Sequence, residues 1–270
     1  MSDADHSPSV TGARPVAPVP RVALVTGAGR RIGRAIASHL AGAGWAVALH
    51  HRAAEAEAAG LAERIARDGG RAVHLAADLA REDEVVGLVA AAEAALGPVG
   101  LVVNNASRFE WDTALESTRA DWDAHLETNL RAPFVLIQEM ARRLPEGSGG
   151  LAVNIIDQRV WNLTPYFTTY TLSKAGLWTL TQTLALALAP RVRVNAIGPG
   201  PTLPSPRQDR AAFEAQCDSV PLRRGTDPDE ICRALSFILD APALTGQMIA
   251  LDGGQHLGWA QGDPRRGADE

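Results

Sequence analysis

The sequence predicts one α/β domain in which helices cover both faces of a doubly wound, seven-stranded parallel sheet. Two observations carry this prediction. Short apolar runs alternate along the chain with longer Ala-rich stretches whose apolar residues recur every three or four positions, and such alternation is typical of parallel sheets with helical crossovers. The composition agrees, because 270 residues with 46% hydrophobic and 21% charged side chains can bury a single large core.

Seven short runs have the composition of buried strands. Each is mostly apolar and is bounded by turn residues or by the end of a helical pattern. They cover residues 22–25, 45–50, 71–76, 100–103, 150–156, 192–196 and 246–251.

Helical spacing marks the stretches between these strands. The expected helices cover residues 35–40, 53–68, 82–96, 121–143, 168–188 and 227–239. Pro228 stands where the last helix begins, whereas Gly97-Pro98 and Ala189-Pro190 stand where two others end. Proline fits the first turn of a helix but cannot continue one.

The ends of the chain and one internal segment differ from the alternating pattern. Residues 1–20 are rich in Pro, Ala, Ser and Val; they lack the basic start and apolar core of a signal peptide, and we expect a disordered arm. Residues 21–257 form the predicted domain, and residues 258–270 a C-terminal tail. The Pro-rich segment 198–210 follows a predicted strand at the edge where open α/β sheets bind ligands, so it is a candidate lid or substrate loop.

Charge, cysteine content and hydropathy narrow the class of protein. A net charge of -5 gives no reason to expect nucleic acid as a partner. The only cysteines, Cys217 and Cys232, are too few for a disulfide framework and lack metal-ligand spacing, so we expect no metal site and a reducing cytoplasm. No apolar run is long enough to span a bilayer, so no membrane partner is expected.

A glycine-rich turn follows the first predicted strand directly. Thr26-Gly27-Ala28-Gly29-Arg30-Arg31-Ile32-Gly33 joins that strand to an apolar helix. Glycines at such spacing also occur in turns without a ligand, but this order of strand, turn and helix is the context that a dinucleotide site requires. The domain is therefore predicted to be of the Rossmann type.

The end of the second predicted strand indicates which dinucleotide binds. NAD-binding sheets of this kind tend to place an acid there, whereas this chain has His50-His51-Arg52. Arg52 and Arg30 offer forked donors suited to a 2′-phosphate, so NADPH is the expected cofactor. Arg31 opposes the dipole of the helix that it starts unless an anion is present, which a pyrophosphate would supply.

A second motif supplies a proton donor. Tyr170 and Lys174 stand four residues apart in a predicted helix, so their side chains are neighbours on one face. An ammonium group beside the phenol favours its anionic form and lets it donate a proton near neutral pH. The two motifs together predict hydride transfer with a nicotinamide cofactor.

Several further motifs resemble those of the short-chain dehydrogenases/reductases in order and spacing, over residues 21 to about 257. They are Thr26-Gly-x-x-x-x-Ile-Gly33, Asp78-Leu79, Asn104-Asn105-Ala106, Asn129, Tyr170-x-x-x-Lys174, Asn195, Pro199-Gly200 and Asp252-Gly253-Gly254. The resemblance implies a Rossmann-type fold, a nicotinamide-dependent oxidoreductase and a homotetramer.

Two departures from the common family pattern are similar to pteridine reductases, a subgroup that includes the dihydromonapterin reductases. Asp157 stands where most members have a serine, and Arg31 stands where they have a glycine. The strings at 26–34, 50–55, 104–109 and 154–157 also resemble that subgroup. Ala53 differs, because the subgroup often has a serine after the arginine at position 52, and one phosphate hydrogen bond would then be missing.

The resemblance implies the reaction. It is NADPH-dependent reduction of a C=N bond in a pterin such as dihydromonapterin, dihydrobiopterin or dihydrofolate. Tyr170, assisted by Asp157, would supply the proton. Lys174 would also hold the nicotinamide ribose, and Asn129 would anchor a water chain for reprotonation.

The resemblance also implies the binding residues. Phe109, which otherwise would belong to the core, would stack on the pterin, with Arg31, Ser107, Asp157 and Tyr170 as the other substrate-binding residues. The expected cofactor-binding residues are Gly27, Arg30, Arg31, Ile32, Gly33, His51, Arg52, Asp78, Leu79, Asn105, Ala106, Ser107, Tyr170, Lys174, Pro199 and Gly200.

Two other functions stay open. One is reduction of a carbonyl, such as a 3-oxoacyl thioester or a sugar ketone; Asp157 speaks against it, because a carboxylate repels a developing alkoxide. The other is an NADPH-binding sensor or scaffold without turnover, against which the intact Tyr170 and Lys174 pair argues. Asp157 itself has a structural interpretation, as a cap at the end of a strand.

Overall fold

The computed structural model describes residues 16–205 and 207–258. Its strands form one seven-stranded sheet in the order β3-β2-β1-β4-β5-β6-β7, and every neighbouring pair is parallel. The strands are β1 (Val22–Val25), β2 (Ala46–His51), β3 (Ala72–Ala76), β4 (Leu101–Asn104), β5 (Gly150–Ile155), β6 (Val192–Pro199) and β7 (Met248–Leu251). The predicted fold class is confirmed.

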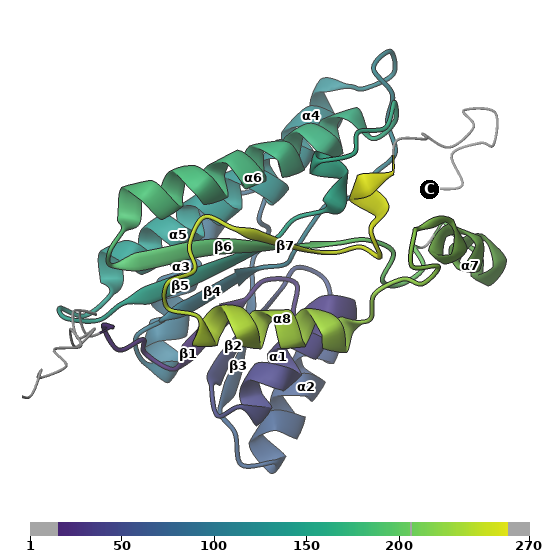
Figure 1. Ribbon diagram of the computed structural model, residues 1–270. Helices are drawn as coiled ribbons and strands as arrows, with labels where there is room; N and C mark the ends of the chain where they lie inside the picture. Colours follow the sequence, from purple (N-terminus) through teal and green to yellow (C-terminus); the bar gives the residue numbers. More distant parts are fainter. Residues whose placement is uncertain (1–15, 206, 259–270) are drawn as a thin grey trace, which may run out of the picture.

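Helices cover both faces of the sheet (Figure 1). They are α1 (Arg31–Gly42), α2 (Glu55–Arg67), α3 (Glu82–Leu96), α4 (Arg119–Leu126), α5 (Ala132–Arg143), α6 (Thr168–Leu188), α7 (Arg210–Ser219) and α8 (Pro228–Asp240). Buried side chains of α1, α2 and α8 pack on one face, and those of α3, α5 and α6 on the other. The apolar strand residues lie between these two layers.

The strand order reverses direction between β1 and β4. Beyond β1 the chain continues to β2 and β3 on one side, and beyond β4 to β5, β6 and β7 on the other. The connections therefore diverge at the carboxyl ends of β1 and β4, which is where doubly wound sheets leave a crevice for ligands.

The predicted helix over 121–143 is interrupted in the structure. It begins as α4, passes through a π-helical turn at Glu127–Arg131 and resumes as α5. Pro133 lacks an amide proton, so the α-helical hydrogen bond to the carbonyl of Asn129 cannot form and the backbone widens. The wider turn carries Asn129, one of the predicted catalytic residues.

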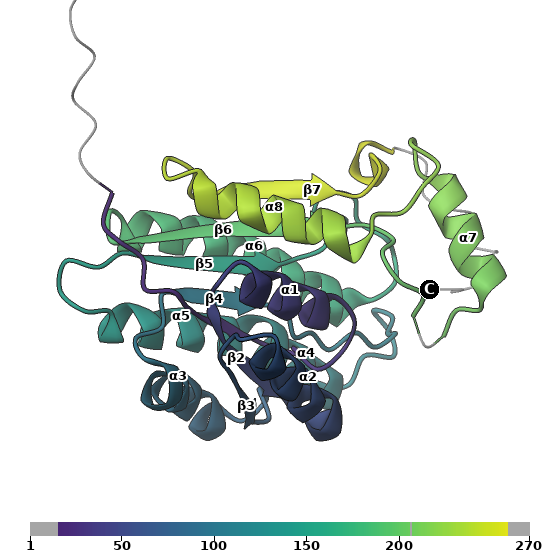
Figure 2. The ribbon, with the colours of Figure 1, turned by 90° about the horizontal axis from the view of Figure 1, so that it is seen from below.

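The segment after the sixth strand also differs from the prediction. β6 continues to Pro199 and pairs with β7 as far as Leu251, so the first residues of the expected Pro-rich loop belong to the sheet. α7, which the sequence pattern did not indicate, follows the loop. Asp209 caps it by accepting a hydrogen bond from the Ala212 amide at 2.8 Å. Figure 2 shows α7 projecting from the end of the molecule where the strands terminate.

The last residues of the expected N-terminal arm lie against the domain. The Gly149 amide donates to the Pro18 carbonyl at 3.0 Å, and Val19 packs against the core cluster that includes residues of α1, α2 and α8. A Cβ on Gly100 would stand 2.1 Å from the Pro20 carbonyl oxygen, so this close approach requires glycine. Residues 1–15 of the arm and 259–270 of the tail lie outside the described residues. Among those described, no helix has the length and apolarity to cross a membrane.

Candidate active site

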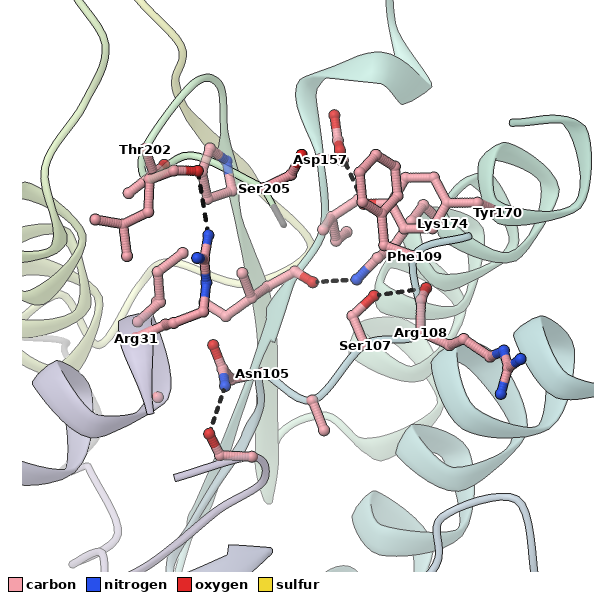
Figure 3. Close-up of a pocket in the computed structure, with 18 of the residues that line it drawn as sticks. Arg31, Asn105, Ser107, Arg108, Phe109, Asp157, Tyr170, Lys174, Thr202 and Ser205 are labelled. Atoms are coloured by element: carbon pink, nitrogen blue, oxygen red, sulfur yellow. Dashed lines mark hydrogen bonds between the residues drawn. The ribbon is translucent and has the colours of Figure 1, made fainter. Parts of the chain in front are cut away.

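A cavity of about 940 Å³ opens at the carboxyl ends of the strands. Most of the predicted site residues line it (Figure 3). The predicted residues on its wall are Gly27, Arg30, Arg31, Ile32, Gly33, Arg52, Asp78, Leu79, Asn105, Ala106, Ser107, Phe109, Asp157, Tyr170, Lys174, Pro199 and Gly200. His51 and Asn129 are not among the lining residues.

The glycine-rich turn is held against the end of β4. Gly27 has a positive φ of 64°, and a Cβ on Gly33 would stand 2.2 Å from the Gly27 carbonyl oxygen, so neither position accommodates a side chain without strain. The side-chain Nδ2 of Asn105 donates to the backbone carbonyl of Thr26 at 2.9 Å. The Thr26 hydroxyl in turn accepts from the backbone amides of Asn105 and Ala106, both at 2.9 Å. The start of α1 therefore packs closely against the ends of β1 and β4, as in a dinucleotide-binding site.

His50, not His51, supports this turn. Successive side chains of a strand point to opposite faces, and the His50 ring lies against the turn, where its Nδ1 accepts a hydrogen bond from the Gly27 amide at 3.1 Å. Its Nε2 lies 3.1 Å from the Ala77 carbonyl. Burial lowers the pKa of His50 to about 4, so the ring is neutral at physiological pH and its Nδ1 can accept. His51 turns away from the cavity to His74, 3.4 Å distant.

Three arginines lie at the α1 end of the cavity. Arg52 is exposed on the wall just after β2. Arg30 forms an ion pair with Glu57 of α2, with its Nε 2.7 Å from the carboxylate. Arg31, whose φ is 53°, donates to the carbonyls of Pro204 at 2.8 Å and Leu203 at 3.1 Å. Arg31 thus connects the start of α1 to the Pro-rich loop (Figure 3).

At the other end of the cavity, three ionisable groups lie together (Figure 3). The Tyr170 hydroxyl donates to Asp157 Oδ2 at 2.8 Å. Lys174, on the same face of α6, donates to the carbonyl of Ile155 at 2.8 Å, and its Nζ lies 5.8 Å from the centre of the Tyr170 ring. Burial lowers the pKa of Lys174 to about 8, while the Asp157 carboxylate acts in the opposite direction.

Asp157 is held by its own backbone as well as by Tyr170. It follows β5 directly, and its Oδ1 accepts from the Arg159 amide at 2.8 Å, which caps the short 3-10 turn Gln158–Val160. One carboxyl oxygen therefore fixes the side chain and the other reaches the phenol. Asp157 therefore acts as a cap, as its structural interpretation expects, whereas its role in proton transfer stays a prediction.

Asn129 lies beside the helix that carries Tyr170 and Lys174, outside the cavity wall. Its side chain is buried; its Oδ1 accepts from the Arg108 amide at 2.8 Å, and its Nδ2 donates to the Arg108 carbonyl and to the Ser173 hydroxyl, both at 2.9 Å. It therefore joins the chain after β4 to the helix that carries Tyr170 and Lys174.

A buried network at the start of α6 was not foreseen from the sequence. The Thr169 hydroxyl lies 2.8 Å from His125 Nδ1 and donates to Asp112 Oδ2 at 2.5 Å. His125 Nε2 accepts from the Glu110 amide at 3.2 Å, and burial lowers the pKa of this histidine. The segment at 110–112, helix α4 and the start of α6 thus meet beside Tyr170. Their residues are far apart in sequence, so no sequence motif predicts this contact.

Phe109 reaches the cavity as predicted, but its ring is already engaged. It stacks on Phe167, with the ring centres 4.6 Å apart and the planes 14° from parallel. It also meets the Tyr170 ring edge to face at 4.7 Å. Ser107 stands on the cavity wall, exposed, with its hydroxyl 3.2 Å from the Arg108 carbonyl.

Residues of the Pro-rich loop form part of the cavity wall. Arg31 holds it at Leu203 and Pro204. Beyond residue 206, which lies outside the described residues, Arg207 donates to the Phe109 carbonyl at 3.3 Å. The described part of the loop therefore contacts both the dinucleotide end and the Tyr170 end of the cavity, and its role as a lid or substrate loop stays a prediction.

Comparisons with known proteins agree with this geometry. A family model described as enoyl-(acyl carrier protein) reductase matches residues 27–256. The 3-oxoacyl-[acyl-carrier-protein] reductase of Synechocystis sp. is 31% identical over 238 residues, covering 87% of this chain and 96% of that protein. The chain belongs to the short-chain dehydrogenase/reductase family and is an oxidoreductase.

Within this family the chain is similar to two solved structures. FolM alternative dihydrofolate reductase 1 from Brucella canis, complexed with NADP, is 48% identical with a TM-score of 0.88, covering 92% of this chain and 98% of that one. The Brucella suis protein, in complex with NADP, is 50% identical with a TM-score of 0.87, covering 91% and 98%. The predicted subgroup, pteridine reductase-like, is confirmed.

Proposed function

We propose that this protein is an NADPH-dependent reductase of pterins or folates. The observation that carries the proposal is the hydrogen bond from the Tyr170 hydroxyl to Asp157 at 2.8 Å. Similarity to the two FolM structures, alternative dihydrofolate reductases in complex with NADP, supports both the substrate class and the cofactor.

The residues at the α1 end of the cavity fit NADPH. The absence of side chains at Gly27 and Gly33 lets the turn pack closely against Asn105 after β4, and the backbone amides at the start of α1 can then face a pyrophosphate. β2 ends without an acid, and exposed Arg52 stands where a 2′-phosphate would need a forked donor. Arg30 can bind the 2′-phosphate only if it breaks its ion pair with Glu57 or contacts both groups at once. Arg52 is therefore the main determinant of cofactor choice in this proposal.

NADPH, when bound, supplies the hydride that reduces a C=N carbon of the pterin. Tyr170 gives its proton to the adjacent ring nitrogen, so that one C–H and one N–H bond form. Asp157 stays within hydrogen-bond reach of the phenol and balances the positive character that the ring gains on protonation. Lys174, protonated below about pH 8, stabilises the phenolate that remains.

Reduction of a carbonyl is the second candidate, because the Synechocystis relative is named for it. The alkoxide that develops in such a reaction would form close to the Asp157 carboxylate and be repelled. A sensor or scaffold without turnover would not need a buried lysine on the same helix face as Tyr170. Pterin reduction makes use of all three groups.

A steady-state absorbance assay with NADPH tests the proposal. The panel holds dihydromonapterin, dihydrobiopterin, dihydrofolate, a 3-oxoacyl thioester and a sugar ketone. Oxidation of NADPH by at least one pterin, with little by the carbonyl compounds, is the expected result. Turnover of the carbonyl compounds alone would make the second candidate correct, and binding of NADPH without any turnover would favour the sensor. The homotetramer and the cytoplasmic location expected from the resemblance stay predictions.

A further inference from the structure

The first turn of α6 carries Tyr170 but has no cap within its own sequence. Phe167 stands at the cap position with φ 58°, and no side-chain capping bond is formed there. The first amides of a helix have no partner inside the helix, and Tyr170 is the third residue of α6. The placement of this residue therefore depends on what the first turn contacts outside the helix.

Asp112, in the segment after β4, supplies the missing cap. Its Oδ2 accepts from the Thr169 amide at 3.1 Å and from the Thr169 hydroxyl at 2.5 Å. Its backbone carbonyl accepts from the Phe167 amide at 2.8 Å. The carboxylate is buried, and a negative charge at this end of a helix also stabilises the helix dipole. The start of α6 is thus fixed by a residue from a distant part of the chain.

His125 of α4 connects this cap to the backbone of Glu110. Its Nε2 accepts from the Glu110 amide at 3.2 Å, so the proton of the ring is on Nδ1. Nδ1 lies 2.8 Å from the Thr169 hydroxyl and 3.0 Å from the Asp121 carbonyl. Because the Thr169 hydroxyl gives its own proton to Asp112, its oxygen can accept from His125. This hydroxyl therefore joins the carboxylate to the imidazole.

The Tyr170 ring contacts two rings that this network holds. The His125 ring meets it edge to face, with the ring centres 6.2 Å apart and the planes at 71°. Phe109, which precedes the amide that His125 binds, meets it edge to face at 4.7 Å. A displacement of Thr169 would therefore reach Tyr170 through the backbone and through both rings. The hydrogen bond from the Tyr170 hydroxyl to Asp157 depends on this placement.

The network itself is closed to the substrate. Asp112, His125 and Thr169 are 4%, 0% and 1% exposed, and none of them is among the residues that line the cavity. The Thr169 hydroxyl donates to the carboxylate and not to the imidazole, so the imidazole does not activate it as a nucleophile. We therefore expect the network to act on the reaction through Tyr170.

We propose that a network of three positioning residues holds Tyr170 where proton transfer requires it. These residues are Asp112, Thr169 and His125. The inference rests on the proposed function, because that function makes Tyr170 the proton donor. Loss of the Thr169 hydroxyl should lower kcat, since proton transfer is sensitive to the placement of the donor. It should not change cofactor affinity, because the glycine turn lies at the other end of the cavity.

Three substitutions beside Tyr170 test the proposal. Thr169→Val keeps the shape and removes the hydroxyl, whereas Thr169→Ser keeps the hydroxyl and removes a methyl group. Thr171→Val is the matched control: Thr171 also adjoins Tyr170, but its buried hydroxyl has no hydrogen-bond partner among the described residues. On dihydrobiopterin, Thr169→Val should lower kcat about tenfold or more and leave the Kd for NADPH unchanged. Thr169→Ser should stay within about threefold of the native kcat, and Thr171→Val should match it.

Three outcomes would overturn the proposal. A native kcat in Thr169→Val would show that the hydroxyl does not position the donor. Equal losses in Thr169→Val and Thr169→Ser would assign the effect to the methyl group, and an equal loss in Thr171→Val would show that any change beside Tyr170 has the same effect. If Thr169→Val does not fold, Asp112→Asn takes its place. Its amide oxygen can still accept from Thr169 but the charge is gone, so kcat should fall about threefold or more; a native kcat would contradict the proposal.

A spectroscopic measurement separates this inference from the proposed function. The chain has two tyrosines, Tyr166 and Tyr170, so isotope labelling of the tyrosine Cζ carbon gives two NMR resonances, which Tyr166→Phe assigns. In the NADPH-loaded protein, Thr169→Val should shift the Tyr170 resonance, whereas Thr169→Ser and Thr171→Val should leave it in place. That result supports the positioning network even if no pterin is reduced. An unchanged resonance in Thr169→Val would refute the network while pterin reduction stands.

Discussion

Replacing Asp157 by asparagine is the most direct test of the reaction. Asparagine has the same shape, so its side-chain oxygen can still cap the 3-10 turn by accepting from the Arg159 amide, a bond of 2.8 Å in the native protein. The change therefore leaves the backbone in place. It removes the negative charge that the Tyr170 hydroxyl now faces at 2.8 Å, and with it a group that can carry a proton.

The size of the effect follows from this single bond. A hydrogen bond to a charged group contributes about 1.5 to 3 kcal/mol and one between neutral groups about 0.5 to 1.5 kcal/mol. The difference of about 1 to 1.5 kcal/mol corresponds to roughly a five- to twelvefold fall in kcat/KM. Loss of the proton carrier adds to this, so we expect a fall of at least about tenfold on a pterin.

The pH dependence should change as well. Burial lowers the pKa of Lys174 to about 8, and the Asp157 charge is what raises it against that burial. Activity that needs protonated Lys174 is therefore present below pH 8 and is lost as the pH rises through about 8. In Asp157→Asn the supporting charge is gone, so the alkaline limb of the kcat profile should move to lower pH.

The assay measures kcat/KM of native, Asp157→Asn and Asp157→Ser protein on dihydrobiopterin and on a 3-oxoacyl model substrate, followed by the pH profile of each active form. Asp157→Ser restores the residue common in the family and should also lose pterin turnover. Its oxoacyl turnover should rise relative to pterin turnover. If Asp157→Ser improved pterin reduction, or if Asp157→Asn matched the native enzyme in both rate and pH profile, Asp157 would have no part in proton transfer.

Three other substitutions test the remaining parts of the site. Tyr170→Phe removes the acid but keeps the ring, so kcat should fall roughly 100-fold while the Kd for NADPH barely changes; full turnover would exclude Tyr170 as the donor. Arg52→Ala should raise the KM for NADPH far more than that for NADH, and equal changes would show that another residue reads the 2′-phosphate. Gly33→Ala places a Cβ 2.2 Å from the Gly27 carbonyl oxygen, so NADPH affinity and Tm should both drop, and an unchanged Kd would contradict the close approach.

The sequence was sufficient to predict the sheet because each strand is a short apolar run between helical patterns. The glycine turn and the Tyr170-x-x-x-Lys174 spacing could also be predicted, because each involves residues that are close in sequence and lie within one or two adjacent elements. Asp157 was found only by comparison with a family pattern. It lies 13 residues before Tyr170 and in a different element, so no helical or strand spacing predicts the hydrogen bond between them.

What the sequence did not predict depends on contacts between distant segments. That His50 and not His51 contacts the glycine turn follows from the strand register, because a shift of one residue exchanges the two faces of the strand. Arg30 was expected to reach the cofactor, but Glu57 on the next helix pairs with it. Arg31 bonds carbonyls more than 170 positions away. The partners of these side chains are known only once the fold is complete.

Relatives of this chain are named for different substrates, a 3-oxoacyl-[acyl-carrier-protein] and dihydrofolate, and the proposed function gives Asp157 a part in choosing between such substrates. In the proposed reaction Tyr170 and Lys174 would supply a proton to whatever atom becomes basic after hydride transfer, and they would not distinguish oxygen from nitrogen. A neighbouring carboxylate does distinguish them: it raises the energy of an alkoxide and lowers that of a protonated ring nitrogen. In this structure the carboxylate is fixed 2.8 Å from the phenol oxygen, where either product atom would form. Under the proposed function, substrate choice would therefore be set beside the proton donor, at the bond between Tyr170 and Asp157.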